Sequence, residues 1–405
     1  MIIRKRLLIP IFGTILGIWL TSQLVARFFN LRDNIRYTDG EVLILSMEAS
    51  GAHLSSAKAI KSKLQNYNIK CDIVLADYYC DPTSVIGSFY ETATRTSLGR
   101  IALNQVFAPG YWMTTPIITR PFSLTISHLL KDSRYKCVVS VIPFNFNIKS
   151  NVPFIIIPTD MVDPKEQFIL DYMPGYWFNR TTLNAYYLLA SERIRAQAIQ
   201  VGISPDRIRK ISGLIVNEAF TSQTKTKAQL RQALRIEKDA KVVLFLFGSC
   251  GSTEMVDLMN IMDQHPQYHC IFVCGKAKEL KARLDGLNVN GKHQVLGFVT
   301  NVAELMTASD VVVGKPGGTV TAESIACKVP IVMRSGIDVM LQERYNVDYI
   351  KELGVGEVVT DWNDLPEMLE WMFENYSEYA ENFKTIPKNN ALQETVEFIK
   401  EVVRG

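Results

Sequence analysis

Three loops in this 405-residue chain combine glycine with hydroxyl or ionisable side chains directly after an apolar run. The first contains Gly51 and His53, the second runs from Gly248 to Ser252, and the third runs from Gly314 to Thr319. Glycine lets a ligand approach the backbone, and the N–H groups that begin a helix favour phosphate. The three loops are therefore candidates for holding a phosphorylated ligand and acting on it.

His53 is the candidate general base of the first loop. It stands where the apolar run Val42–Leu45 gives way to a helix expected near Ser55–Leu64. Because the unperturbed imidazole pKa lies near neutrality, a histidine at the end of a strand can accept a proton from a hydroxyl. A purely structural role for His53 is the alternative at this stage.

The second and third loops are suited to a nucleotide. The second follows the apolar run Lys241–Phe247 and offers backbone N–H groups and serine hydroxyls to a diphosphate. It lacks the lysine of a P-loop, which argues against an ATPase. In the third, Gly317, Gly318 and Thr319 precede Glu323, which lies one turn into the expected helix.

The elements that carry these loops alternate between short apolar runs and amphipathic helices. Such alternation predicts an α/β fold made of two doubly wound parallel units. The hinge is expected at the polar stretch Gly213–Lys227. The predicted domains are residues 38–215 and 228–385, with a terminal helix in 386–405 that packs on either half. The predicted strands are Val42–Leu45, Cys71–Leu75, Cys137–Val141, Phe154–Ile157, Val242–Phe247, Cys270–Val273, Val295–Phe298, Asp310–Val313 and Pro330–Met333.

The N-terminus predicts a membrane anchor in residues 1–30. No charged residue occurs from Leu7 to Ala26, which is long enough for a helix to cross about 30 Å of hydrocarbon. A cleaved signal peptide is the alternative, but no small-x-small cleavage site follows the apolar run. Basic residues flank the run on both sides, so the positive-inside rule decides little about its orientation.

The composition narrows the functional classes. A net charge of +3, with no basic tract longer than Arg4-Lys5-Arg6, argues against a nucleic-acid partner. The seven cysteines show no disulfide spacing, which favours a reducing compartment. His265, His269, Cys270 and Cys274 resemble metal ligands, but the run 270–273 has the pattern of a buried strand, so no metal site is predicted.

An aromatic stretch from Tyr78 to Leu130 fits the α/β alternation poorly. It is interpreted either as an apolar lip that meets a lipid or bilayer, or as helices that pack on the sheet.

The third loop, together with Gly297–Asn301 before it and Gln342–Asn346 after it, resembles the donor-binding half of the monogalactosyldiacylglycerol synthase and processive diacylglycerol glucosyltransferase family. That family is related to the N-acetylglucosaminyltransferase that makes lipid II. The likeness extends from Val42 to the C-terminus. It implies a GT-B fold, in which two Rossmann-like domains face a cleft.

The resemblance also implies roles for particular residues. Glu323 would bind the ribose hydroxyls of a UDP-sugar, and His53 would be the base for the acceptor hydroxyl, with Asp160 as a further carboxylate on the acceptor side. Gln342, Glu343 and Asn346 would hold the sugar hydroxyls. The remaining implied contacts are Gly248, Ser249, Gly251, Ser252, Gly317, Gly318 and Thr319 on the donor side, and Gly51 and Trp177 on the acceptor side.

Two departures from the family pattern concern the acceptor. The glycine triplet that precedes the histidine in relatives is Ala49-Ser50-Gly51-Ala52 here, which restricts the backbone. Thr159-Asp160 is not followed by the histidine that relatives have before the pair corresponding to Trp177-Phe178.

The sequence thus predicts an inverting glycosyltransferase that moves a hexose from a UDP-sugar to a membrane lipid such as diacylglycerol. Nothing in the sequence requires a cofactor or divalent ion, and the catalytic domains are expected on the cytosolic side of a membrane. The alternatives are a UDP-sugar epimerase of the same fold and a catalytically silent membrane-bound scaffold.

Overall fold

The computed structural model describes residues 40–47, 51–76, 96–102, 104, 122–131, 134–143, 148, 150–159, 177–178 and 184–404. The membrane anchor predicted in residues 1–30 lies outside these ranges, as does much of the aromatic stretch Tyr78–Leu130. Within the described ranges, no helix is both long and apolar enough to span a bilayer.

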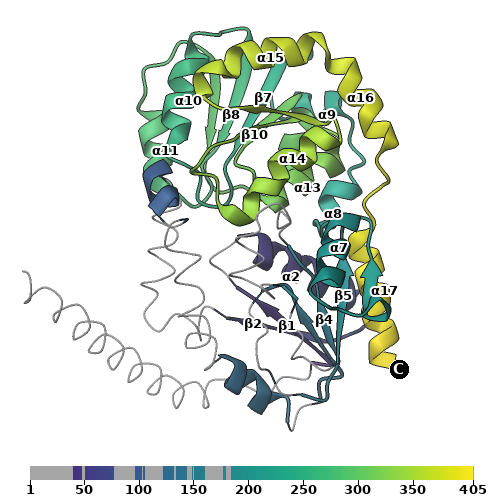
Figure 1. Ribbon diagram of the computed structural model, residues 1–405. Helices are drawn as coiled ribbons and strands as arrows, with labels where there is room; N and C mark the ends of the chain where they lie inside the picture. The colour runs from purple at the N-terminus through teal and green to yellow at the C-terminus, as the bar shows by residue number, and fades with distance from the viewer. Residues whose placement is uncertain are drawn as a thin grey trace, which may run out of the picture.

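The described chain forms two halves, each built on a parallel sheet of six strands (Figure 1). The lower sheet has the order β2-β1-β3-β4-β5-β6, and the upper sheet has the order β12-β11-β10-β7-β8-β9. The lower strands are β1 Val42–Ser46, β2 Cys71–Leu75, β3 Cys137–Ser140, β4 Phe154–Ile156, β5 Ala185–Leu189 and β6 Ile208–Lys210. The upper strands are β7 Lys241–Leu246, β8 Tyr268–Val273, β9 Lys292–Leu296, β10 Val311–Gly314, β11 Ile331–Arg334 and β12 Gly356–Val359.

The central strands are apolar throughout because helices cover both faces of each sheet. All five residues of β1 are buried, and in β7 only Lys241 is exposed. The strand predicted at Val295–Phe298 is shifted, since β9 runs over Lys292–Leu296 and the side chain of Phe298 is 66% exposed. The prediction failed here because β9 lies at the sheet edge, where polar residues replace the apolar run.

The strand order places the three glycine loops at the positions where these folds bind ligands. In a doubly wound sheet, ligands bind beyond the carboxyl ends of the strands at the point where the strand order reverses. In the lower sheet this point lies between β1 and β3, and in the upper sheet between β7 and β10. The first loop follows β1, the second follows β7 and the third follows β10.

Helices connect the strands and surround both sheets (Figure 1). The lower half contains α2 Gly51–Gln65 and α7 Glu192–Gln200, with helical turns also at 97–102 and 122–129. The remaining elements up to the end of the upper half are η1 Pro205–Arg207, α8 Glu218–Thr221, α9 Lys227–Ala233, α10 Glu254–Asp263, α11 Lys278–Asp285, α12 Val302–Ala308, α13 Gly318–Cys327, η2 Leu341–Glu343, α14 Arg344–Glu352, η3 Trp362–Asp364, α15 Leu365–Glu374 and α16 Tyr376–Thr385.

The terminal helix α17, Ala391–Arg404, returns from the upper half to the lower one (Figure 1). It packs against α2, and its Val396 and Ile399 side chains are fully buried in the core that also contains Val42 and Ile60. The sequence left open which half this helix joins, and the structure places it on the lower half.

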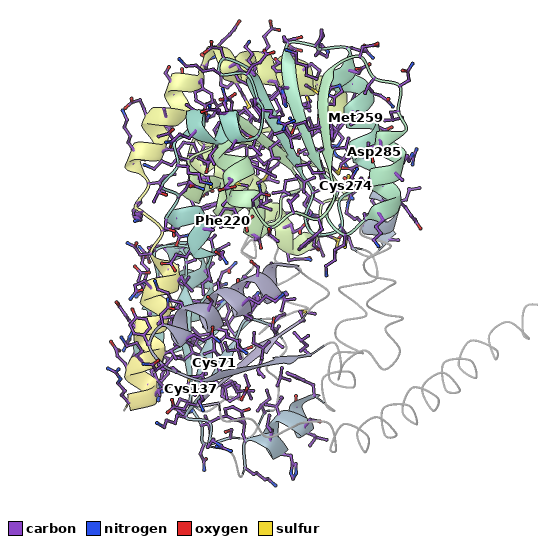
Figure 2. The ribbon with its side chains drawn as sticks, turned by 180° about the vertical axis from the view of Figure 1, so that it is seen from behind. Cys71, Cys137, Phe220, Met259, Cys274 and Asp285 are labelled. Atoms are coloured by element: carbon purple, nitrogen blue, oxygen red, sulfur yellow. The ribbon has the colours of Figure 1, made fainter. Side chains whose placement is uncertain are left out.

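The cysteines of the described residues are all free. Cys71 and Cys137 belong to the lower core and Cys274 to the upper core (Figure 2). Every residue of β8 is buried, which confirms the interpretation of Cys270–Val273 as a core strand. Among the described residues, no three His, Cys, Asp or Glu side chains are grouped so as to hold a metal.

Candidate active site

His53 is fixed at the interface of the two halves by its Nδ1 atom. Nδ1 lies 2.6 Å from the carbonyl oxygen of Val141, directly after β3, and 2.9 Å from the hydroxyl of Thr159, shortly after β4. A carbonyl can only accept a hydrogen bond, so Nδ1 carries the proton and Nε2 carries the lone pair. This is the tautomer that a general base requires.

Burial keeps His53 uncharged. The side chain is 5% exposed, and desolvation lowers its pKa to about 4, partly offset by the bond to Val141. The imidazole is therefore neutral at pH 7. Within the described part of the chain, no other hydrogen bond to the ring is formed, so Nε2 is available for a substrate hydroxyl.

Two further residues expected on the acceptor side have different outcomes. The ring of Trp177 is buried 6.1 Å from the ring of His53, centroid to centroid, so it forms part of the wall around the base. Asp160 lies outside the described residues. The residue that hydrogen-bonds to His53 is its neighbour Thr159. The sequence analysis did not assign a role to the Thr159 hydroxyl or the Val141 carbonyl.

The second loop is a tight turn between β7 and α10. Gly248 has φ +85° and Gly251 has φ +60°, and the N–H of Gly251 donates to the carbonyl of Gly248 at 3.3 Å. These backbone angles favour glycine. The loop places Ser249 and Ser252 ahead of the N-terminus of α10, with Ser252 buried and Ser249 near the lower half.

The third loop leads into α13, whose N-cap makes no side-chain hydrogen bond to the first turn of the helix. Gly317 is the N-cap, and the first turn, which includes Gly318 and Thr319, contains no acidic residue that would compete for the N–H groups. Lys315 bridges the second and third loops. Its Cε would lie 3.5 Å from a Cβ at Gly248 and 3.3 Å from one at Gly317, and its Nζ contacts Glu343 at 2.8 Å. The sequence analysis missed this cation.

The two halves meet at these loops. A Cβ added to Gly51 would lie 3.4 Å from the Ser249 hydroxyl, and one added to Gly318 would lie 2.7 Å from the carbonyl oxygen of Thr159. The residue that bonds to His53 therefore touches the beginning of α13 in the upper half. The structure brings the candidate base and both glycine loops to one interface.

Glu323 lies in α13 and is only 9% exposed. Burial raises the pKa of its carboxyl group to about 8, because desolvation disfavours the charged form. The group is therefore mostly protonated at pH 7, and a ligand that supplies hydrogen-bond donors, such as a pair of hydroxyl groups, would favour its ionised form.

Gln342, Glu343 and Asn346 are positioned by η2 and the first turn of α14. Asn346 is 1% exposed and donates its Nδ2 to the carbonyl of Pro316 at 2.8 Å, so it supports the third loop. Its Oδ1 is buried and has no hydrogen-bond partner among the described residues. Glu343 is held by Lys315, whose Nζ lies 2.8 Å from its carboxylate.

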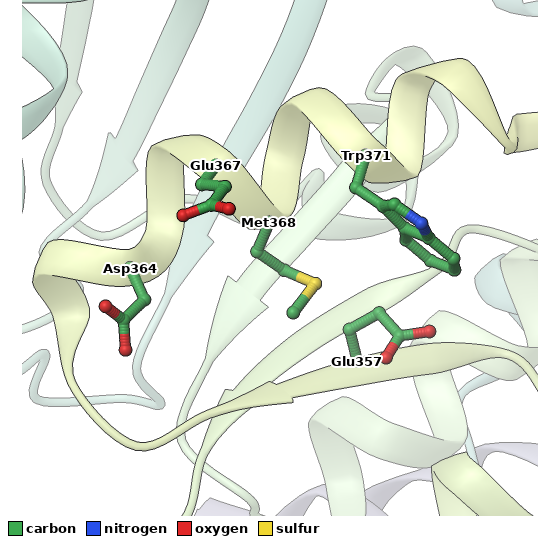
Figure 3. A pocket seen from close by; sticks show the side chains of 5 residues that line it. All are labelled: Glu357, Asp364, Glu367, Met368 and Trp371. Carbon is green, nitrogen blue, oxygen red and sulfur yellow. The ribbon is translucent and has the colours of Figure 1, made fainter.

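A separate cavity of about 320 Å³ lies beside the edge strand β12 and α15 (Figure 3). Its lining residues are Glu357, Asp364, Glu367, Met368 and Trp371, none of which belongs to the three loops. The cavity is therefore distinct from the candidate site.

Comparison with known proteins bears on the fold. Residues 226–389 match the family of glycosyl transferases group 1. The solved structure of MurG from Acinetobacter baumannii is 13% identical, covers 89% of this chain and 99% of MurG, and has a TM-score of 0.56. The glycotransferase of kitacinnamycin is 13% identical, covers 90% of this chain and 100% of that protein, and has a TM-score of 0.61. These likenesses establish the two-domain fold.

Curated relatives confirm the resemblance found in the sequence. A probable chloroplastic monogalactosyldiacylglycerol synthase of Glycine max is 25% identical over 391 residues, which cover 90% of this chain and 72% of that protein. The Arabidopsis thaliana synthase 1 is 24% identical, covering 80% of this chain and 64% of that protein. The processive diacylglycerol β-glucosyltransferase of Staphylococcus carnosus is 26% identical, covering 55% of this chain and 53% of that protein.

Proposed function

We propose that this protein transfers a hexose from a UDP-sugar to a diacylglycerol-like membrane lipid, with inversion at the anomeric carbon. The observation that carries the proposal is His53, whose Nδ1 is bound to Val141 and Thr159, so that among the described residues only Nε2 is left to accept a proton. Thr159 in turn contacts Gly318 in the third glycine loop of the other half. Relatives named for the synthesis of glycolipids on diacylglycerol support the choice of acceptor.

In the proposed reaction, the acceptor hydroxyl attacks the anomeric carbon and Nε2 of His53 takes its proton. A carbon–oxygen bond forms to the acceptor as the bond from the anomeric carbon to the diphosphate breaks, and UDP departs with the electron pair. The Val141 carbonyl stabilises the imidazolium through its bond to Nδ1–H. The Thr159 hydroxyl limits rotation of the ring.

The donor would be held by the upper half. The N-termini of α10 and α13, which follow the second and third glycine loops, and the Lys315 ammonium would stabilise the charge that develops on the leaving diphosphate. Glu323 would accept hydrogen bonds from the ribose, and Gln342 from the sugar. The predicted anchor in residues 1–30 would keep the site at the surface that contains its lipid.

The test is transfer from radiolabelled UDP-glucose, UDP-galactose and UDP-N-acetylglucosamine to diacylglycerol in vesicles, measured with wild type, His53→Ala and Glu323→Ala. The matched control is His265→Ala, in the loop between α10 and β8 at the opposite end of the sheet. We expect transfer by wild type and His265→Ala only. Interconverted UDP-sugars without labelled lipid would replace the proposal with an epimerase, and UDP binding without either reaction would indicate a silent scaffold.

A further inference from the structure

One short segment of the lower half of the chain docks on the upper half. Residues 96–102 and 104, which we call the crossing segment, lie between β2 and the helical stretch 122–129, both of which belong to the lower half. The segment is the short blue helix at the edge of the upper half in Figure 1. Its polar contacts are made with α10 and with the loop that follows β11.

Arg100 ties these two upper elements together. Its Nη2 donates to the carboxylate of Glu254, the first residue of α10, and to Oδ2 of Asp338 at 2.7 Å, while its Nε donates to the Asp338 carbonyl at 3.0 Å. The Ser97 hydroxyl donates to the same carboxylate oxygen at 2.6 Å. Glu254 stands two residues after Ser252, so the contact reaches the end of the second glycine loop.

Asn104 holds the backbone of the loop after β11. Its Nδ2 donates to the carbonyls of Val339 at 2.8 Å and Ile337 at 3.2 Å, and its Oδ1 accepts from the N–H of Leu341 at 3.3 Å. Leu341 immediately precedes Gln342 in η2. A single buried amide thus fixes the backbone on which Gln342 stands.

The cluster pairs charges of opposite sign and is partly sheltered from water. Among the described residues, Arg334 also contacts Glu254 and Asp338, so two guanidinium groups meet two carboxylates, and the Asp338 side chain is only 4% exposed. Although burial opposes it, the bonds from Ser97 and Arg100 keep the pKa of Asp338 below its usual value. Removing Arg100 would leave the buried Asp338 and the partly buried Glu254 with one guanidinium fewer, which is unfavourable for Asp338 in particular.

We propose that the crossing segment is a functional part of the donor site. In it, Arg100 and Asn104 are positioning residues that hold the second glycine loop and the backbone of Gln342 in the arrangement that binds the donor. This inference rests on the proposed function, because it takes both elements to bind the UDP-sugar. Neither side chain is assigned a contact with the donor. Their effect is transmitted through Glu254, Asp338 and the Leu341 backbone.

The test uses the full chain with Asn104→Asp, which keeps the acceptor for Leu341 but removes both donated bonds at nearly constant volume. The matched control is Asn363→Asp, at an exposed residue whose side-chain amide donates to Asp361 and to no other described residue. We expect the Kd for UDP and the KM for the UDP-sugar to rise about ten-fold, equivalent to about 1.4 kcal/mol. The KM for the lipid should not change. Arg100→Met should give the same pattern.

Hydrogen exchange of the unliganded protein separates this inference from the proposed function. We expect faster exchange in peptides covering 248–256 and 335–346 in Asn104→Asp, with wild-type rates in the lower sheet. Unchanged exchange in both peptides, or a lower Tm with unchanged donor affinity, would overturn the role of the crossing segment. A wild type that binds no UDP would instead overturn the proposed function, and the exchange rates would still decide whether the segment holds these loops.

Discussion

The chemistry proposed for His53 depends on which of its ring nitrogens carries the proton and is hydrogen-bonded to Val141. We expect His53→Asn to lower kcat by ~10²–10⁴-fold, because the amide can still donate to Val141 but cannot accept the proton. UDP affinity should be unchanged. Thr159→Val, which keeps the Val141 bond and loses only the hydroxyl, is the matched variant and should cost far less. Equal losses in the two variants would contradict the assignment of Nε2 as the base.

The pH dependence of the same residue follows from its burial. A pKa lowered to about 4 means that the base is neutral throughout the range above pH 5, so protonation of His53 should not reduce kcat on going from pH 7.5 to pH 6. The measurement is kcat at saturating donor and lipid across this range. A loss of activity centred near pH 6.5 would show an unshifted imidazole instead.

Glu323 should make donor binding depend on pH, unlike the effect of His53 on kcat. Burial raises its pKa to about 8, and the ionised form is the one that accepts hydrogen bonds from ribose. UDP should therefore bind more weakly as pH falls, by up to ~10-fold per unit below pH 8, with proton release on binding. Calorimetry at pH 6, 7 and 8 checks this. In Glu323→Gln the steep dependence should disappear, leaving only that of the phosphate.

At the scale of elements, the start of α13 is the most constrained point of the site. In Gly318→Ala the new Cβ would lie 2.7 Å from the Thr159 carbonyl, so the two halves must separate locally and the Thr159–His53 contact is strained. We expect activity to fall by ~10²-fold, as misplacement by part of an ångström can cause. Gly297→Ala, whose Cβ would meet only the Lys281 side chain at 3.5 Å, is the control. Comparable activity in the two variants would argue against this contact.

Most of the elements could be predicted because their signals are local. Continuous apolar runs identified the central strands, and glycine followed by a helical pattern identified the three loops. The search for continuous apolar runs would also have found β5, which was not predicted. It could not identify β6 and β12, because these edge strands include exposed or charged residues such as Arg209 and Glu357. The bonds of Val141 and Thr159 to His53 could not be predicted, since they join residues 88 and 106 positions apart.

At the scale of the whole molecule, the halves are joined by elements that pack on the opposite half from their neighbours in the sequence. The terminal helix α17 belongs to the lower core although it follows the upper half, and the crossing segment docks on the upper half although it precedes β3. The sequence analysis divided the chain at Gly213–Lys227 because a polar stretch is a local signal. Docking of a distant segment leaves no such signal, because one arginine and one asparagine have no periodicity.

A third connection between the halves is partly exposed to solvent, so it can be removed with little damage to either core. The Arg193 guanidinium, on α7, lies 4.2 Å from the centroid of the Tyr345 ring and 2.9 Å from the Glu352 carboxylate, both on α14. The contact should be worth about 0.5–1 kcal/mol, so Arg193→Ala should favour separation of the halves by roughly 2–5-fold.

We therefore expect Arg193→Ala to increase the radius of gyration measured by X-ray scattering and to lower kcat/KM for the donor by the same few-fold, with little change in Tm. The control is Arg195→Ala on the same helix, because the one ion pair that Arg195 forms within the described part of the chain is with its near neighbour Glu192. If the two variants scatter and react alike, the contact between α7 and α14 does not hold the halves together. If only Arg193→Ala expands, the connection of the halves at α14, next to Asn346, contributes directly to the assembly of the donor site.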